Sequence, residues 1–92
     1  MRQQLEQERI DGEAARQLLN NPIFKRLWQE AEQDILAQMQ AVEMRDTDMH
    51  TKLIFALKIF HQMKRHVERT LETGEMATLQ LNEPNKHKAF GR

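Results

Sequence analysis

The histidines are the first residues in this chain with chemistry suited to a functional site. His50, His61 and His66 fall on one predicted helix, at spacings of 11 and 5 residues. Two histidines that share a metal ion on a helix stand three or four residues apart, so that both rings lie on one face. At about 100° per residue, the rings of His61 and His66 point in different directions. This spacing favours polar surface positions over a zinc site.

Paired carboxylates are the second candidate, in Glu30 with Asp34 and in Glu68 with Glu72. Carboxylate metal sites in helical bundles add a Glu-x-x-His motif, which this sequence lacks. A solvated helix face is the simpler interpretation of both pairs. The chain also has no serine, no cysteine and no glycine-rich phosphate loop. We therefore expect a protein that is not an enzyme and holds no metal or cofactor.

A row of basic residues is the third candidate. Lys58 and Arg65 stand seven residues apart and Arg69 four further on, which places them along one side of a helix where they could meet phosphates. A solvated face and an acidic protein surface are the alternatives. The chain has 14 basic and 14 acidic residues, and a zero net charge argues against non-specific nucleic-acid binding. The helix is also too long and too apolar for a helix-turn-helix reader.

Aromatic residues are candidates for protein contacts. Phe24, Trp28 and Phe60 lie on predicted apolar helix faces, and Phe90 stands alone in the basic C-terminal stretch. An exposed aromatic cluster acts as an energetic anchor for a partner, whereas a packed one belongs to the core. We weigh Trp28 as a core residue first, and retain all four side chains as candidate protein-binding residues.

The elements that position these residues follow from apolar spacing and capping signals. The spacing predicts three helices, at residues 2–19, 22–43 and 47–73. Asp11 is a candidate N-cap inside the first of these, and Gly12 next to it weakens a continuous helix. Asn21 is expected to cap the second helix, with Pro22 at its first position. Asp46, Thr47 or Asp48 caps the third, and Gly74 is its expected C-terminal stop.

Each predicted helix has an apolar stripe. On the first it comprises Ala14, Ala15, Leu18 and Leu19. On the second it comprises Phe24, Leu27, Trp28, Ala31, Ile35, Met39 and Val42. On the third it comprises Met49, Leu53, Ala56, Phe60, Met63, Val67 and Thr70, widened by Leu57 and Leu71. Ile54, Phe55 and Ile59 fall outside this last stripe, so one partner helix cannot cover every apolar residue.

Together these signals predict an all-α protein with one domain over residues 1–81 and a flexible basic tail over 82–92. Its centre is an antiparallel hairpin of two long helices, with a short N-terminal helix at one end. The chain has 92 residues, of which 39% are apolar and 30% charged. Two helices enclose little interior, so burial barely offsets the entropy of ordering the chain. We therefore expect a protein partner, either a second copy or a larger assembly.

Membrane and export signals are missing from the pattern. No run of 18 apolar residues occurs, and the first residues, MRQQLEQERI, lack the apolar core of a signal peptide. We expect no contact with a membrane and a protein that stays in the compartment where it is made.

The stretches EAARQLLNNPIFKRLWQEAEQDILAQM and RDTDMHTKLIFALKIFHQMKRHVERTLETGEMA resemble small helical-hairpin proteins of tailed-bacteriophage genomes. The resemblance covers residues 13 to about 80 and consists of caps and apolar stripes. The matching positions are Ala15, Leu18, Leu19, Asn21, Pro22, Phe24, Arg45, Asp46, Leu53, Leu57, Glu72, Thr73 and Gly74.

This resemblance implies a phage protein, in the host cytoplasm or the virion, with a structural or assembly role. Such a protein would oligomerise or dock on a larger virion or packaging complex. Two other functions remain open: a nucleic-acid-associated packaging or regulatory accessory that uses Lys58, Arg65 and Arg69, and a small phage inhibitor of a host protein.

Overall fold

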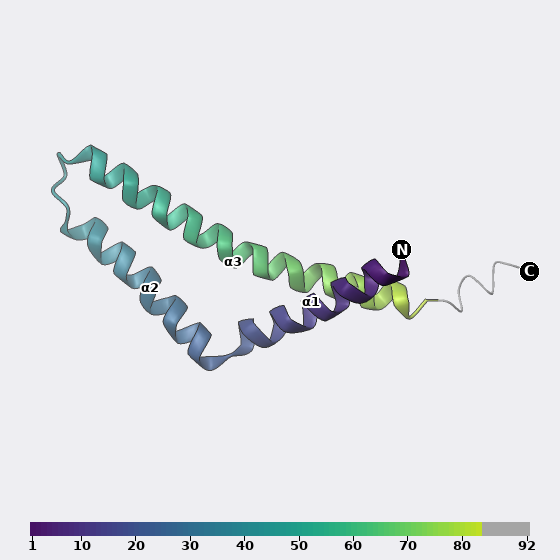
Figure 1. Cartoon of the computed structure of the whole chain (residues 1–92). Helices are drawn as coiled ribbons and strands as arrows, with labels where there is room; N and C mark the ends of the chain where they lie inside the picture. The colour runs from purple at the N-terminus through teal and green to yellow at the C-terminus, as the bar shows by residue number, and fades with distance from the viewer. Residues whose placement is uncertain (84–92) are drawn as a thin grey trace, which may run out of the picture. The chain divides into compact units, whose positions relative to one another are not determined.

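The computed structural model describes residues 1–83, and these residues form three helices and no strand (Figure 1). The helices are α1 (Arg2–Asn20), α2 (Pro22–Ala41) and α3 (Thr47–Leu81). The all-α prediction is confirmed. The predictions that fall on residues 84–92, which include Phe90 and most of the 82–92 tail, lie outside the described residues.

The chain divides into two compact units, which we describe separately. Unit 1 comprises Met1–Leu19 and the described part of Val67–Arg92, and so contains α1 and the C-terminal part of α3. Unit 2 comprises Asn20–His66 and contains α2 and the N-terminal part of α3. The prediction of a single domain over residues 1–81 stays a prediction.

Helix α1 is continuous, and the predicted cap at Asp11 is wrong. The Asp11 carboxylate accepts a hydrogen bond from Gln7 Nε2 one turn earlier, at 2.9 Å, as a side chain within a helix does. Gly12 is buried, together with Ala15, while Ala14 and Leu18 of the predicted stripe are exposed. The predicted bounds of 2–19 agree with Arg2–Asn20, although a helix of 19 residues is not short beside the 20 residues of α2.

Gly74 does not end α3, which continues to Leu81. No described glycine has a positive φ, so Gly74 lacks the left-handed conformation of a helix stop. It lies instead where α1 crosses the C-terminal part of α3 within unit 1 (Figure 1). A Cβ built on Gly74 would stand 2.6 Å from Gly12 Cα and 2.9 Å from the Glu8 carbonyl oxygen. Both glycines are required by this close approach of two backbones.

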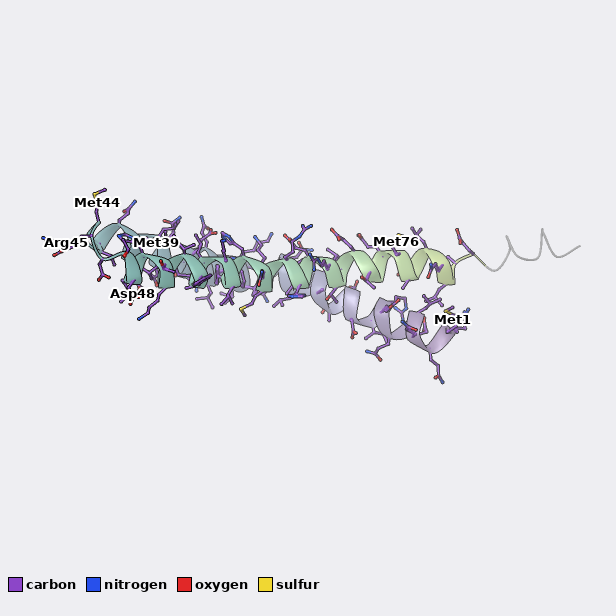
Figure 2. The ribbon with its side chains drawn as sticks, turned by 90° about the horizontal axis from the view of Figure 1, so that it is seen from above. Met1, Met39, Met44, Arg45, Asp48 and Met76 are labelled. Atoms are coloured by element: carbon purple, nitrogen blue, oxygen red, sulfur yellow. The ribbon has the colours of Figure 1, made fainter. Side chains whose placement is uncertain are left out.

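Small residues extend the contact in unit 1 along both helices. Ala15 follows Gly12 by three residues and Ala77 follows Gly74 by three, and both alanines are buried. Leu81 is buried near the end of α3. Met76 points away from α1, as Figure 2 shows, and is exposed. Unit 1 is therefore packed mainly through residues that let the helices approach closely.

The starts of α2 and α3 are fixed by local caps, as the sequence predicts. The Asn21 side-chain oxygen accepts hydrogen bonds from the backbone N–H groups of Ile23 and Phe24, at 2.8 and 3.0 Å, and Pro22 occupies the first helical position. Asp46 is the cap of α3, since its carboxylate accepts from Met49 N at 3.1 Å and its carbonyl accepts from His50 N. In the turn before it, Met44 and Arg45 project outward (Figure 2).

Replacing Asn21 with alanine is expected to lower the free energy of unfolding by about 1 kcal/mol, because two N–H groups of α2 lose their acceptor. Urea denaturation followed by circular dichroism measures this change. Asn20→Ala is the matched control at the neighbouring exposed position, and we expect it to change stability by less than about 0.5 kcal/mol. Equal effects of the two substitutions would contradict the cap.

Helix α3 packs in unit 2 through a face rotated from the predicted stripe. Leu53 is buried and Leu57 and Phe60 are half-buried, but Met49, Ala56 and Met63 of the predicted stripe are exposed. On α2 the predicted stripe is half-buried except at Leu27, which is 54% exposed. The sequence gives α3 two adjacent apolar faces in this region, and α2 covers only one of them.

Candidate protein-binding surface

The aromatic residues that the sequence singles out come together in unit 2. The rings of Trp28 and Phe60 stack, with centroids 3.9 Å apart and planes at 22°. The rings of Phe24 and Trp28 lie 5.5 Å apart at 38°. All three side chains are half-buried. Their contacts join α2 to α3, so we assign these three residues primarily to packing within the unit.

One polar contact links the same helices, and a second joins α3 to the turn that follows α2. His61 Nε2 lies 2.5 Å from Glu32 Oε2, in a pair that is salt-bridged when the imidazole is charged. His50 Nε2 lies 3.0 Å from the Glu43 carbonyl oxygen, to which the ring N–H donates. Sequence spacing alone gave no sign of either contact, because both partners come from another element.

A group of large apolar side chains in unit 2 remains exposed, and we call it the apolar flank. Each of its members is between 40% and 59% exposed. The members are Ile23 and Leu27 on α2, and Met49, Phe55, Ile59 and Met63 on α3. Two of these, Phe55 and Ile59, are residues that the sequence predicted one partner helix would leave uncovered.

Helical geometry places the apolar flank away from the Glu32–His61 contact. At about 100° per residue, Ile59 and Met63 lie roughly 160° around α3 from His61. On α2, Ile23 and Leu27 lie roughly 140–180° from Glu32 by the same count. Ile23 and Leu27 of α2 and Ile59 and Met63 of α3 therefore lie away from the polar contact, whereas the exposed Ile54 lies on the side of α3 that carries His61.

The predicted basic residues follow the polar side of α3. Lys58 and Arg65 of unit 2 lie within about 60° of His61 around the helix. Lys58, Arg65 and Arg69 are exposed, and none makes an ion pair with another residue in the described range 1–83. The nucleic-acid role of these three residues stays a prediction.

Several other cations are paired on their own helices. The Arg16 guanidinium donates hydrogen bonds of 3.0 and 2.5 Å to the Glu13 carboxylate, which lowers the pKa of Glu13 and raises that of Arg16. Because the pKa of Glu13 is lowered on folding, the pair stabilises the folded state at pH values above the carboxyl pKa of the unfolded chain. This stabilisation is lost as the pH falls through the carboxyl pKa of the folded chain. Both groups are exposed, so the pair affects stability only weakly.

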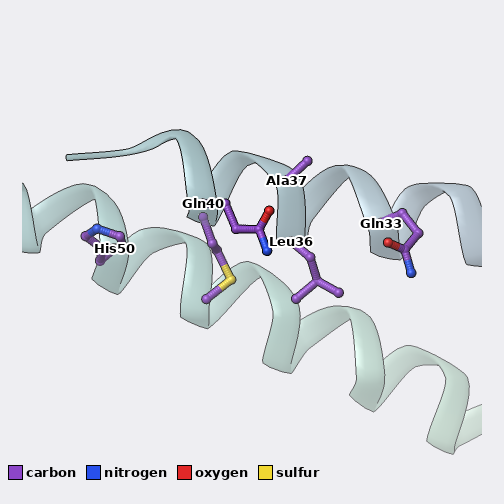
Figure 3. Close-up of a pocket in the computed structure, with 6 residues that line it drawn as sticks. Gln33, Leu36, Ala37, Gln40 and His50 are labelled. Atoms are coloured by element: carbon purple, nitrogen blue, oxygen red, sulfur yellow. The ribbon is translucent and has the colours of Figure 1, made fainter. Parts of the chain in front are cut away.

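The depressions on the two units offer no evident chemistry. One, of about 420 Å³, is bordered by Leu36 and Gln40 of α2 and by His50 of α3 (Figure 3). The His50 Nε2 that borders it already donates to the Glu43 carbonyl oxygen. Among residues 1–83 no group of three or more His, Asp or Glu side chains is placed to hold a metal ion. The apolar flank is thus the most distinctive surface of the described chain.

Comparison with known proteins gives no match to this chain, whether against protein-family models, curated proteins or solved structures. None of the described helices is long and apolar enough to cross a membrane.

Proposed function

We propose that this chain is a non-enzymatic structural or assembly protein of a tailed bacteriophage, which oligomerises or docks on a larger virion or packaging complex. The antiparallel helical hairpin formed by α2 and the N-terminal part of α3 would be its binding element. The order of contacts supports this antiparallel hairpin. Trp28 contacts Phe60, whereas Glu43, which follows Trp28 in the chain, contacts His50, which precedes Phe60.

The observation that carries the proposal is the imbalance between core and exposed apolar surface. Within residues 1–83 the buried hydrophobic side chains are Ala15, Leu53, Ala77 and Leu81, and no large side chain is completely buried. Fully burying a large apolar side chain stabilises a protein by about 1.5–3 kcal/mol, so burial of the apolar flank in an interface would stabilise the protein further. A protein partner that covers this surface would supply this stabilisation.

The assembly role is tested in phage-infected cells. A tagged full-length chain is expected to sediment with particles or assembly intermediates, and deletion of its gene is expected to lower the yield of complete particles. Restoring the yield by supplying the chain from a plasmid is the control for effects on neighbouring genes. Unchanged particle yield together with absence of the chain from all particle fractions would overturn the proposal.

The alternative of a nucleic-acid accessory has one supporting observation, the exposed cations without ion pairs at Lys58, Arg65 and Arg69. It predicts DNA binding that falls steeply with salt, with a slope of log K against log[salt] of about −0.9 per phosphate contact. Replacing Lys58 and Arg65 with alanine should then reduce the slope by about one for each contact removed. Fluorescence anisotropy with a duplex measures this; salt-independent or undetectable binding rejects the alternative. A role as an inhibitor of a host protein remains a hypothesis with no supporting contact.

A further inference from the structure

We propose that the apolar flank of unit 2 is the interface between two copies of this chain, related by a two-fold axis. The proposal rests on the proposed function, because it specifies the surface through which the protein oligomerises. In the pair, α2 and the N-terminal part of α3 from each copy would form a four-helix arrangement around the joined flanks.

The size of the flank suits such an interface. Six large side chains, each about half exposed, present on the order of 500 Å² per copy. Interfaces of standard size bury roughly 800 Å² per partner, and polar residues at the rim supply the remaining area. An apolar area of about 500 Å² equals that of the largest patches on monomers, which are often functional. The flank would therefore form the apolar centre of an interface, and rim residues would have to supply the rest.

Charge favours a second copy over a strongly charged partner. The whole chain has 14 acidic and 14 basic residues, so two copies do not repel each other. The exposed cation Arg65 lies on the other side of α3 from Ile59 and Met63, and Lys58 lies at the edge of the flank, about 60° from Phe55. Lys52 lies near Met49 on the flank side of α3, and it is paired with Asp48 on its own helix at 3.3 Å. A two-fold axis requires a patch that complements itself, and apolar side chains meet that condition.

Two isoleucines provide a matched test. Ile59 belongs to the flank and is 56% exposed, whereas Ile54 on the same helix is 44% exposed and lies about 20° from His61, on the polar side. Ile59→Glu places a charge inside the proposed interface and should weaken association at least about tenfold. Ile54→Glu makes the same chemical change outside the interface and should leave association unchanged.

Sedimentation equilibrium of the full chain across a wide concentration range gives the result. The unaltered protein and Ile54→Glu are expected at twice 11.0 kDa, and Ile59→Glu at 11.0 kDa with unchanged helicity. Because the chain has no cysteine, Ile59→Cys and Ile54→Cys provide a second readout that tolerates loss of stability in the glutamate variant. A short bis-maleimide should cross-link the first into dimers and not the second.

The outcomes separate this inference from the proposed function. A protein that stays at 11.0 kDa at every concentration overturns the two-copy interface, while particle association in infected cells would still support docking on another partner. A dimer that Ile59→Glu leaves intact, or that Ile54→Glu disrupts equally, assigns the interface to another surface. A discrete trimer overturns the two-fold arrangement.

Discussion

A leucine in place of Gly74 is expected to lower the free energy of unfolding by about 3 kcal/mol and the thermal midpoint by roughly 15 °C. The first side-chain atom would already lie 2.6 Å from Gly12 Cα and 2.9 Å from the Glu8 carbonyl oxygen. Both neighbours are backbone atoms, so no rotamer change relieves the overlap and the helices must separate. Thermal unfolding followed by far-ultraviolet circular dichroism measures the loss.

The sign of this change in stability distinguishes two interpretations of Gly74. Either the close helix crossing requires the glycine, or the glycine only weakens α3. Leucine favours a helix over glycine by roughly 1 kcal/mol, so a glycine that only weakened α3 would give a more stable variant. Thr73→Leu is the matched control, since Thr73 is the preceding, exposed residue of the same helix. We expect it to change stability by less than about 0.5 kcal/mol. A Gly74→Leu protein as stable as Thr73→Leu would contradict the close crossing.

Replacing Trp28 with alanine should destabilise the protein by about 2–3 kcal/mol. Removal of a core tryptophan costs about 3–5 kcal/mol, and the half-buried position of Trp28 reduces that figure. The variant loses the ring stack with Phe60 and the contact with Phe24. Urea denaturation at low protein concentration measures the change without a contribution from association.

Leu36→Ala is the control for the tryptophan substitution. Leu36 is a large apolar residue of the same helix, but it is exposed and lies outside the apolar flank. Its truncation should cost less than about 0.5 kcal/mol. If Trp28→Ala proves equally mild while a partner no longer binds, the tryptophan is a contact residue and its assignment to the core is wrong.

The sequence predicts those features of the fold that depend on neighbouring residues. Asn21 and Asp46 cap helices by accepting from N–H groups two to four positions away, and Pro22 follows its cap directly, so these signals are readable locally. Gly74 was predicted to be a helix stop by the same local logic. The glycine is needed because Gly12, 62 positions earlier, approaches it, and no local pattern contains that information.

The choice of the face through which α3 packs also depends on residues that are distant in the sequence. Met49, Ala56 and Met63 have heptad spacing as good as that of the packed residues His50, Leu57 and Phe60. Periodicity shows that two apolar faces exist, but the choice between them depends on the shape of the α2 surface, where Trp28 needs a flat partner such as Phe60. This face of α3 was predicted as core but is exposed, because α2 covers the adjacent face. The same exposure makes it a candidate binding site.

The Trp28–Phe60 stack gives the molecule a built-in optical label. Trp28 is the sole tryptophan and the chain contains no tyrosine, so near-ultraviolet excitation and emission arise from one indole in unit 2. The glycine crossing in unit 1 contains no chromophore. Emission from the indole therefore follows the melting of one unit, while the amide signal follows both, and a mismatch between the two curves would expose stepwise loss of structure.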